Sequence, residues 1–417
     1  MISRIAWRNI LRNKRRSLIL TASIIVGVVA IVLARAFVAG FMDQILANQI
    51  GTDVGYIQIH KAGYQSDPGI DNSISSPDQI GNILSRDSTI LNFAERLRTF
   101  GLVSSAYNSS GVSIVGVIPG EEEKITTMHQ YVVKGNYLGD SQDQILISTS
   151  IAEKLKVGIG DKVVIMASQI DGSVGSEACR VCGIYETFNS GFDQSHVYVT
   201  LQTLRRMLNT PHLVSEFVIN PVNKKKLDDV LGILKSDIAP LRDGKPTGEN
   251  TTQGYEVLSY EDMLPLFVMQ IGLYNQIYYV IYAIIAVAMI FGIVDVMLMA
   301  VMERTHEIGV TIAVGMADTK IFRMILTEAL FLGVFGTLIG LAVSYFSCME
   351  LARTGWDLSV FAASLRSFGS GSKIYLVMDY PTFFRVLFFV PIVTVIGAVY
   401  PASKAVHLQP VEAIRVV

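Results

Sequence analysis

Charged residues are scarce in this sequence. Only 17% of its 417 residues are Asp, Glu, Lys or Arg, their formal balance is -2, and the mean hydropathy is +0.43. Soluble globular domains carry about 25% charged residues, so this composition lies outside the usual soluble range. The near-neutral balance offers no basic excess, and no nucleic-acid partner is expected. Membrane spans are therefore the first feature to look for.

Cysteine is scarce as well, with only Cys179, Cys182 and Cys348 present. The first two form C-x-x-C inside an expected strand, "ACRVCGI". Residues three apart on a strand point to opposite faces, which disfavours both a shared metal ion and a disulfide between them. Packing is the favoured interpretation, and a redox or disulfide role stays open.

Motifs for catalysis and nucleotide binding are missing. The sequence has no G-x-x-x-x-G-K-[ST] loop, because "RDGKPT" lacks both the earlier glycine and the following hydroxyl. His306 and Glu307 begin like the zinc-protease helix H-E-x-x-H, but residue 310 is valine, so the second ligand is absent. We expect a chain that is not an enzyme and holds no cofactor or metal of its own.

Long apolar runs, by contrast, are abundant. A bilayer core of about 30 Å needs roughly 20 apolar residues in a helix. Four runs are close to or beyond that length, which predicts spans at 17–42, 264–302, 323–349 and 385–403. The last is short and holds Pro391, which neighbouring helices can accommodate in a membrane. At about 1.5 Å per residue, the second helix exceeds a bilayer core, so its start should project outward as a stalk.

The N-terminus is basic, and the first acidic residue is Asp43. The positive-inside rule therefore places it in the cytoplasm. Residues 1–16 are expected to form an amphipathic helix on the inner membrane surface, with simple orienting charge as an equally open interpretation. A cleaved signal peptide is the competing reading, but the apolar run is too long for one.

Four spans place 43–263 and 350–384 outside, and 303–322 and 404–417 inside. The segment 43–263 is long enough for its own core and shows mixed α and β patterns. The stretches "GYIQIH" and "GVSIVGVI" read as strands, the first of them half-buried. The stretch "DQILISTSIAEKLKVGIGDKVVIMAS" reads as strand, helix, turn and strand, and "HVYVTLQTLRRML" as strand and helix. The fold class is a four-helix membrane protein with a large mixed α/β extracytoplasmic domain.

A polar helix, 303–322, is expected between the second and third spans. Its charges, which include Glu303, Arg304 and Glu307, suit contact with a soluble partner. Ile308, Ile312 and Ala313 follow at helical spacing and predict an apolar strip beside them. This arrangement is typical of a lever that another protein drives.

These stretches resemble a known family. "ERTHEIGVTIAVGM" followed by "FRMILTEALFLGVFGTLIGLAVSY" is similar to the coupling helix and third span of FtsX-type ABC permeases, which include MacB and the lipoprotein-release permeases LolC and LolE. The two chain ends, "AWRNILRNKRRSLILTASIIVGV" and "YPASKAVHLQPVEAIRVV", resemble the same family, as does "DQILISTSIAEKLKVGIGDKVVI" of the outer domain.

The resemblance implies a mechanism called mechanotransmission. The coupling helix docks on a separate ATPase dimer, which binds ATP and magnesium, and closure of that dimer moves the outer domains. Carried over, the ATPase contact consists of Glu303, Arg304, Glu307, Ile308, Gly309, Ile312, Ala313 and Gly315. The resemblance also implies a second permease copy, identical or different, and an inner-membrane location with both termini in the cytoplasm.

Lipoprotein extraction from the inner membrane is the leading functional hypothesis, with a periplasmic carrier as a further open partner. The alternatives are export of peptides, antibiotics or other amphiphiles, an FtsX-like regulator of an outer hydrolase, and a membrane-anchored sensor or enzyme. An apolar, adaptable set near the outer ends of the first two spans suits acyl chains: Phe37, Phe41, Met263, Phe267, Met269 and Tyr274. Lipid contact or helix packing is the competing interpretation of that set.

Polar residues and glycines inside the spans give further expectations. Asp295 should face protein or water, because a charge in lipid is costly. Arg35 and Glu328 are expected to extend toward the membrane interfaces and receive no role. Gly336-x-x-x-Gly340 allows close helix contact, more within one protomer than between two copies.

Overall fold

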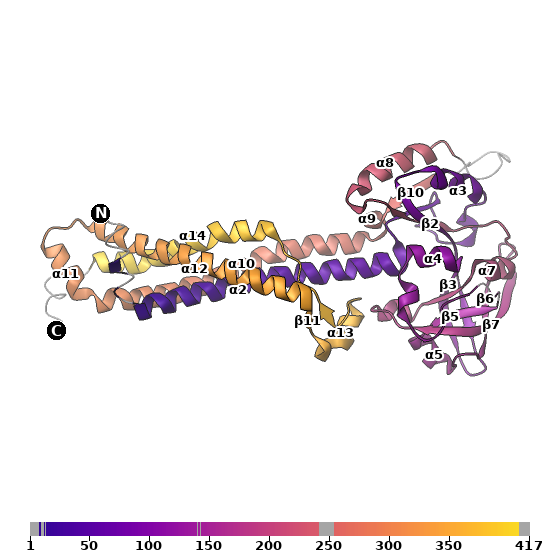
Figure 1. Cartoon of the computed structure of the whole chain (residues 1–417), viewed down its shortest axis with the longest axis horizontal. Coiled ribbons are helices and arrows are strands. Elements are labelled where there is room, and N and C mark those ends of the chain that lie inside the picture. The colour runs from indigo at the N-terminus through magenta and orange to yellow at the C-terminus, as the bar shows by residue number, and fades with distance from the viewer. Residues whose placement is uncertain are drawn as a thin grey trace. The chain divides into compact units, whose positions relative to one another are not determined.

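The computed structural model describes residues 8, 9, 12, 14–139, 141, 143–241 and 254–407. The chain divides into two compact units (Figure 1). The helical unit comprises Met1–Asp43, Gln270–Leu358 and Lys373–Val417, and the α/β unit comprises Gln44–Met269 and Ser359–Ser372. Most of the expected amphipathic segment 1–16, most of the tail 404–417 and nearly all of the loop "DGKPTGENTTQG" lie outside the described residues.

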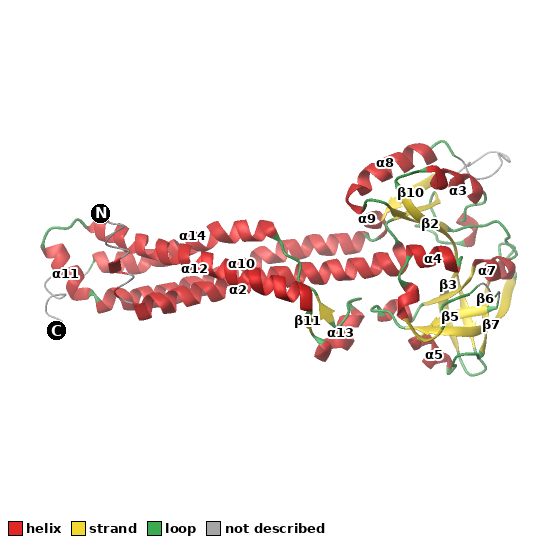
Figure 2. Cartoon of the chain, in the orientation of Figure 1, coloured by secondary structure: helices red, strands yellow, loops and turns green. Residues whose placement is uncertain are grey.

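Four long helices, coloured red in Figure 2, are long and apolar enough to cross a membrane. They are α2 (Lys14–Gln49), α10 (Pro265–Glu303), α12 (Asp318–Thr354) and α14 (Tyr380–Val406). Each corresponds to one predicted span, and α2, α12 and α14 extend past it at both ends. The reason is that helical hydrogen bonds continue into polar flanks, whereas the prediction followed only the apolar residues.

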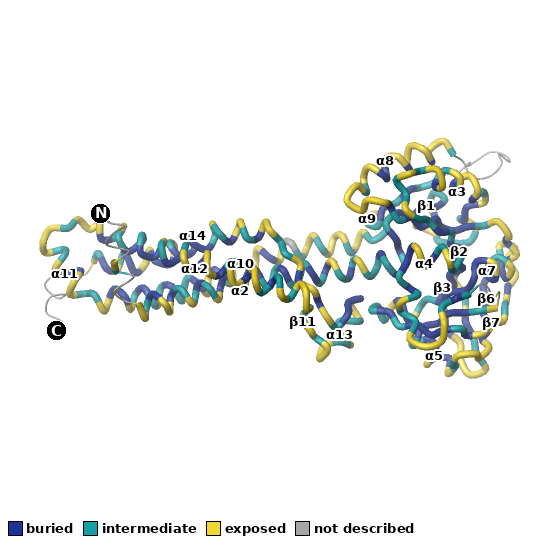
Figure 3. The backbone as a smooth tube through the Cα atoms, viewed as in Figure 1, coloured by how far each residue is buried: buried dark blue, intermediate teal, exposed yellow. Residues whose placement is uncertain are grey.

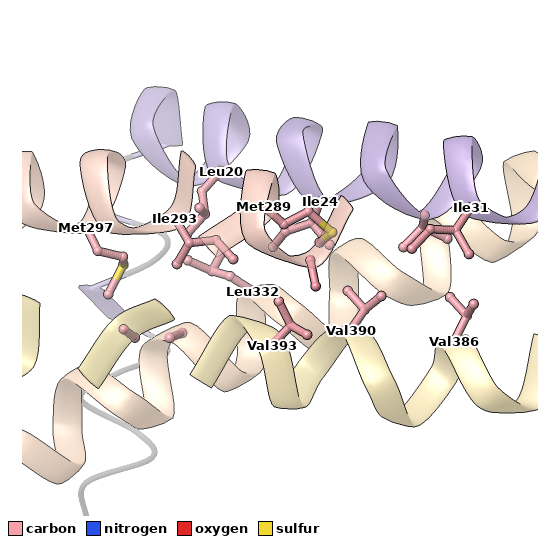
Figure 4. Packing of buried hydrophobic residues seen from close by; sticks show 14 of the residues in the cluster. Leu20, Ile24, Ile31, Met289, Ile293, Met297, Leu332, Val386, Val390 and Val393 are labelled. Atoms are coloured by element: carbon pink, nitrogen blue, oxygen red, sulfur yellow. The ribbon is translucent and has the colours of Figure 1, made fainter. Parts of the chain in front are cut away.

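The helical unit is apolar inside and outside. Its core is built from side chains of all four long helices, including Ile24 of α2, Ile293 of α10, Leu332 of α12 and Val390 of α14 (Figure 4). Buried and exposed residues alternate along each helix (Figure 3), and many of the exposed ones are large and apolar, such as Phe291 at 71%. A helix that is hydrophobic on all sides is typical of a membrane environment.

Two glycines let α2 and α12 approach closely. A Cβ atom added to Gly336 would lie 2.8 Å from Ile24, and one added to Gly340 would lie 2.8 Å from Val28. Both contacts are within one chain, so the interpretation of packing inside the protomer is confirmed for these glycines.

The α/β unit contains one ten-stranded sheet. Its strands are β1 (Ile57–Lys61), β2 (Ile90–Ser104), β3 (Ser109–Val117), β4 (Val132–Gly135), β5 (Gln144–Ser148), β6 (Lys162–Ser168), β7 (Val174–Tyr185), β8 (His196–Thr200), β9 (Glu216–Pro221) and β10 (Tyr255–Ser259). The helices are α3 (Pro77–Arg86), α4 (Pro119–Ile125), α5 (Thr149–Leu155), α6 (Ser190–Asp193), α7 (Leu201–Leu208), α8 (Leu227–Ile238) and α9 (Tyr260–Met263). The strand order is β10-β1-β9-β2-β3-β8-β5-β7-β4, and β6 pairs with β2 and β7.

Six of these strands close a ring, because β2 pairs with β3, β3 with β8, β8 with β5, β5 with β7, β7 with β6, and β6 with β2 again. One core packs aliphatic side chains of these strands with α5 and α7. Ser148 and Thr200 start those helices by accepting hydrogen bonds from the backbone N–H groups of Ile151 and Thr203. The strand and helix order predicted for 143–168 and 196–208 is confirmed.

The cysteines of the C-x-x-C pair lie on β7 and belong to different cores. Cys179 is buried in the core of the six-stranded ring, whereas Cys182 packs against a second cluster that contains Tyr185 and Tyr198. Both thiols are free, and burial raises the pKa of Cys179 to about 12. Opposite faces were predicted from the strand spacing, and the structure confirms them.

Strand β1 corrects the expectation of a half-buried strand at "GYIQIH". Ile57, Gln58, Ile59 and His60 are all buried, because β1 lies between β9 and β10 and side chains cover both of its faces. Strand β1 follows the end of α2, and β10 precedes α9 and α10. The paired strands β1 and β10 therefore join the two helices that connect the α/β unit to the rest of the chain.

A network of buried charges holds the end of α2 on the sheet. The α2 helix continues as a π-helical turn, Ile50–Val54, where Asp53 meets two arginines of β2. Arg96 donates to the Asp53 carbonyl oxygen at 2.6 Å, and Arg98 donates to its carboxylate at 2.6 Å. Arg96 also pairs with Glu122 of α4 at 2.7 Å, and both arginines pair with Glu216 of β9.

This network predicts weaker folding at low pH. Burial lowers the pKa of His60 and His196 below the ordinary 6.5, so protonation of the unfolded chain is favoured as the pH falls through that value. Burial alone would raise the pKa of Glu216, but Arg98 and Arg96 outweigh it and hold this pKa below 4.5. The Glu216 contribution is therefore lost at still lower pH. Urea unfolding of the detergent-solubilised chain should show a lower midpoint at pH 5.5 than at pH 7.5, and lower again at pH 4; a higher midpoint at pH 5.5 would contradict this assignment.

Candidate functional site

The polar stretch between the second and third long helices forms the short helix α11, Thr305–Ala313, at one end of the helical unit (Figure 1). A turn follows in which Gly315 has φ +95, a conformation that favours glycine. Helix α12 then begins at Asp318. The predicted single helix 303–322 is therefore wrong in extent, because the glycine turn ends α11 and residues 318–322 belong to α12.

The structure separates the predicted contact residues into exposed and buried groups. Glu303, Glu307, Ala313 and Gly315 are exposed. Ile308 and Gly309 are buried, and Ile312 packs partly buried against the core of the helical unit. The apolar strip expected for partner contact is thus mostly an internal surface, because α11 uses it to pack on its own bundle.

Two valines outside the predicted contact set supply the exposed apolar surface. Val310 is 43% exposed and Val314 is 84% exposed. The periodicity of the stretch gave the spacing of the apolar residues but not which side faces the bundle. Single exposed apolar residues are common on protein surfaces, so a docking role for the two valines stays a prediction.

A buried carboxylate lies beneath α11. Glu328 of α12 is only 3% exposed, and it accepts a hydrogen bond from Arg16 at 3.0 Å and lies 3.7 Å from Arg304. The expectation that Glu328 extends to the membrane interface is wrong, because its charge is paired inside the helical unit. The charge within the apolar run "LTEALFL" was visible in the sequence, but its partners on α2 and before α11 were not.

Arg304 therefore contributes to this internal cluster. Its side chain is 11% exposed, and it also donates to the Asn9 carbonyl oxygen at 3.1 Å. Arg12 forms an ion pair with Glu307 across the same region. Two arginines of the N-terminal stretch, Arg12 and Arg16, and Arg304 thus pair with acidic residues at the base of α11 and fix its position.

A cavity of about 240 Å³ opens between these groups. Its charged lining includes Arg12, Arg16 and Glu307, and its apolar lining includes Met297 and Ile308. Side chains from the N-terminal segment, α10, α11 and α12 therefore surround one hollow. The lining thus mixes apolar side chains with charged groups, some of them largely buried, such as Arg16 and Glu328.

Another ion pair involves Arg35, farther along α2. Arg35 donates to Asp379 at 2.8 Å, and its guanidinium lies 4.5 Å from the ring centre of Tyr278. Tyr278 in turn donates to the Ala34 carbonyl oxygen at 3.0 Å. Arg35 is therefore held by partners on α10 and before α14, and its place at the membrane interface stays a prediction.

The expected substrate residues do not all lie in one unit. Phe37 stacks on Phe41 with ring centres 6.3 Å apart and meets the edge of Trp356 at 5.6 Å. These two and Tyr274 belong to the helical unit, whereas the other three predicted residues, Met263, Phe267 and Met269, belong to the α/β unit. Their role as a lipid site stays a prediction.

Two other expectations concern single charges and metals. Asp295 lies exposed on α10 in this single chain. Among the described residues, no three His, Cys, Asp or Glu side chains gather in a way that could hold a metal ion.

Comparison with known families assigns most of the chain. Residues 17–233 match the MacB-like periplasmic core domain, and residues 279–410 match the FtsX-like permease C-terminal domain. The chain belongs to the FtsX/MacB family of ABC transporter permeases. Helix α11 and its glycine turn lie within the second match, so the candidate site is part of the permease domain.

Individual relatives carry two kinds of name. The chain is 20% identical to the lipoprotein-releasing system transmembrane protein LolC of Neisseria meningitidis, over 100% of both chains. It is 22% identical to the macrolide export ATP-binding/permease protein MacB 2 of Yersinia pestis, over 97% of this chain but 56% of that protein. Among solved structures, the periplasmic region of MacB from Actinobacillus actinomycetemcomitans covers 52% of this chain with a TM-score of 0.35 and 14% identity.

Proposed function

We propose that this permease subunit is driven by a separate ATPase and extracts lipoproteins from the outer leaflet of the inner membrane. In this proposal the chain performs no chemistry. The ATPase dimer binds ATP and magnesium and pushes on α11, and two permease copies act together. Motion of the helical unit then passes to the α/β unit, which lies outside the membrane and releases the lipoprotein to a carrier.

The proposed contact with the ATPase rests on the exposed face of α11. Glu307, Val310 and Val314 supply charge and apolar surface side by side, while Ile308 and Arg304 fasten the helix to the bundle. A helix that is exposed on one side and fixed on the other transmits a push instead of absorbing it. The arrangement therefore suits a lever better than it suits a binding loop.

The lipoprotein part has a different basis. The end-to-end match with a LolC protein supports it, since the alignment covers both chains completely. The matches with macrolide exporters support the alternative, in which the same lever drives export of peptides, antibiotics or other amphiphiles. Both functions use the same ATPase contact, so the substrate has to be decided by experiment.

Replacing Glu307 with lysine should abolish stable association with the ATPase. The change reverses the charge of an exposed side chain on the contact face and also breaks its ion pair with Arg12. Co-purification of the ATPase with the full-length chain in nanodiscs measures this loss. Glu350→Lys is the matched control, because Glu350 is an exposed glutamate of α12 outside the proposed contact, and it should bind like wild type.

Substrate choice is tested in the same nanodiscs by the rate of ATP hydrolysis. Stimulation by a triacylated lipoprotein supports extraction, whereas stimulation by a soluble macrolide or peptide alone supports export.

An additional variant, Arg12→Ala, separates the two effects of the Glu307→Lys change on ATPase binding. It removes the ion pair with Arg12 but keeps the exposed carboxylate of Glu307. If wild type binds no ATPase at all, the coupling role of α11 is wrong.

A further inference from the structure

The connection between α12 and α14 contains a segment that packs with the α/β unit. Residues 359–372, called the strut below, belong to that unit, although the chain before and after them belongs to the helical unit. The short strands β11 (Trp356–Asp357) and β12 (Lys373–Ile374) pair with each other at the base of this excursion. The strut itself contains a 3-10 turn, Ser359–Phe361, and the helix α13, Ala362–Ser367.

An ion pair fastens α13 to the turn that follows β7. Arg366 lies 2.5 Å from the carboxylate of Glu186 and also donates to the Thr187 carbonyl oxygen at 3.1 Å. The turn is itself braced from inside, because Asp193, only 3% exposed, accepts hydrogen bonds from the Thr187 backbone N–H and from its hydroxyl at 2.7 Å. Arg366 therefore binds a fixed target and not a mobile loop.

A buried triplet, Gly369-Ser370-Gly371, makes the second contact. Ser370 is 0% exposed, and Asn48 near the end of α2 donates to the Gly369 carbonyl oxygen at 3.0 Å. A Cβ added to Gly371 would lie 3.3 Å from the ring of Phe188. Gly369 has φ +82, so the triplet follows a path that favours glycine and approaches its neighbours closely.

These contacts are unusual for a loop. Connecting loops normally run over the surface with a hydrated backbone, and a buried backbone needs partners for its polar groups. Here residues 369–371 of the strut are buried beside the end of α2 and a braced turn, whereas residues 359–368 are exposed or partly exposed. That geometry is expected where the position of a connection matters.

We propose that the strut is a mechanical link in addition to α2 and α10, through which movement of α12 and α14 reaches the α/β unit. Arg366 is its positioning residue. This inference rests on the proposed function, in which an ATPase drives such movement. The strut proposal adds a specific expectation. Removing the Arg366–Glu186 ion pair, which is far in sequence from α11, should uncouple ATP hydrolysis from movement of the α/β unit.

The test is a charge swap in the full-length chain with its ATPase in nanodiscs. Arg366→Glu and Glu186→Arg each place like charges together, and the double variant restores an opposite pair. Both side chains are about one third exposed, so the single variants should fold. Arg353→Glu serves as the control, because Arg353 is an exposed arginine at the end of α12, outside the strut.

Two readouts are taken. Hydrogen exchange of residues 359–372 should become about five-fold faster in each single variant and return to the wild-type rate in the double variant. Release of a fluorescent triacylated lipopeptide per ATP hydrolysed should fall in the same two variants, with the ATP hydrolysis rate itself unchanged. The control should match wild type in both readouts.

The possible outcomes distinguish a failure of the proposed strut role from a failure of the proposed lipoprotein substrate. Unchanged exchange in the single variants overturns the docking role of Arg366, and faster exchange with wild-type release per ATP overturns the link. If wild type releases no lipopeptide, the lipoprotein proposal fails. The mechanical role of the strut is then tested by trapping the ATPase with ATP and vanadate. Trapping should then alter exchange of residues 44–61 in wild type but not in the single variants; an equal change in all of them overturns the link.

Discussion

Arg96→Met is expected to lower the free energy of unfolding of the α/β unit by about 3–5 kcal/mol. Arg96 and Glu122 are both fully buried, and Arg96 also contacts Glu216 and the Asp53 carbonyl oxygen. Methionine fills a similar volume but leaves Glu122 buried without its cation. Removing one partner of a buried ion pair is far more damaging than replacing both, because the remaining charge keeps its desolvation cost.

Urea-dependent hydrogen exchange of the β2 peptide in the full-length chain measures this effect. Arg206→Met is the matched control: Arg206 is 45% exposed and pairs with Asp143 and Glu177 at the surface, so its loss should cost about 0–1 kcal/mol. The double variant Arg96→Met, Glu122→Leu should recover part of the loss. A single variant within about 1 kcal/mol of wild type would show that the network contributes little.

Glu328→Ala should release α11 from the bundle at a cost on the order of 3 kcal/mol. Glu328 is the shared partner of Arg16 and Arg304, whose side chains are only 12% and 11% exposed. Without the carboxylate, two cations face each other close to the base of α11. We expect faster hydrogen exchange in residues 303–317 and weaker retention of the ATPase.

Two comparisons sharpen this result. Glu328→Gln keeps the hydrogen-bond acceptor and the volume, so its effect should be smaller than that of alanine. Glu350→Ala removes an exposed carboxylate from the same helix and should leave both readouts unchanged. Wild-type exchange at α11 in Glu328→Ala would mean that the remaining contacts, which include Ile308, Ile312 and the Arg12–Glu307 ion pair, hold the helix without help from Glu328.

The fold class was accessible from the sequence because the relevant signals are local. Apolar length marks helices that can span a bilayer, and short runs rich in valine and isoleucine mark strands such as β3 and β5. Capping residues Ser148 and Thr200 mark where helices follow strands. The spacing of Cys179 and Cys182 likewise fixed their opposite faces. Each of these patterns acts within one element, so no knowledge of the neighbours is needed.

Only part of the candidate site around α11 could be predicted from the sequence. The sequence located the stretch around Glu307 and its apolar spacing, but it placed Ile308 on the partner side and left Glu328 and Arg35 without roles. Each of those assignments depends on which neighbour covers the residue. Arg16 and Glu328 are more than 300 residues apart in sequence, with |i−j| = 312, and no local pattern joins them.

The sequence by itself therefore determined the long apolar helices, several strands and short helices of the α/β unit, the membrane-type composition and the family resemblance of the coupling stretch. Only the tertiary structure decided which face of α11 is free, which arginines neutralise the buried carboxylates, and that the strut packs with the α/β unit. The physical reason is that secondary structure follows from periodicity and backbone preference along the chain. Burial and ion pairing depend on contacts between distant segments, which exist only once the chain has folded.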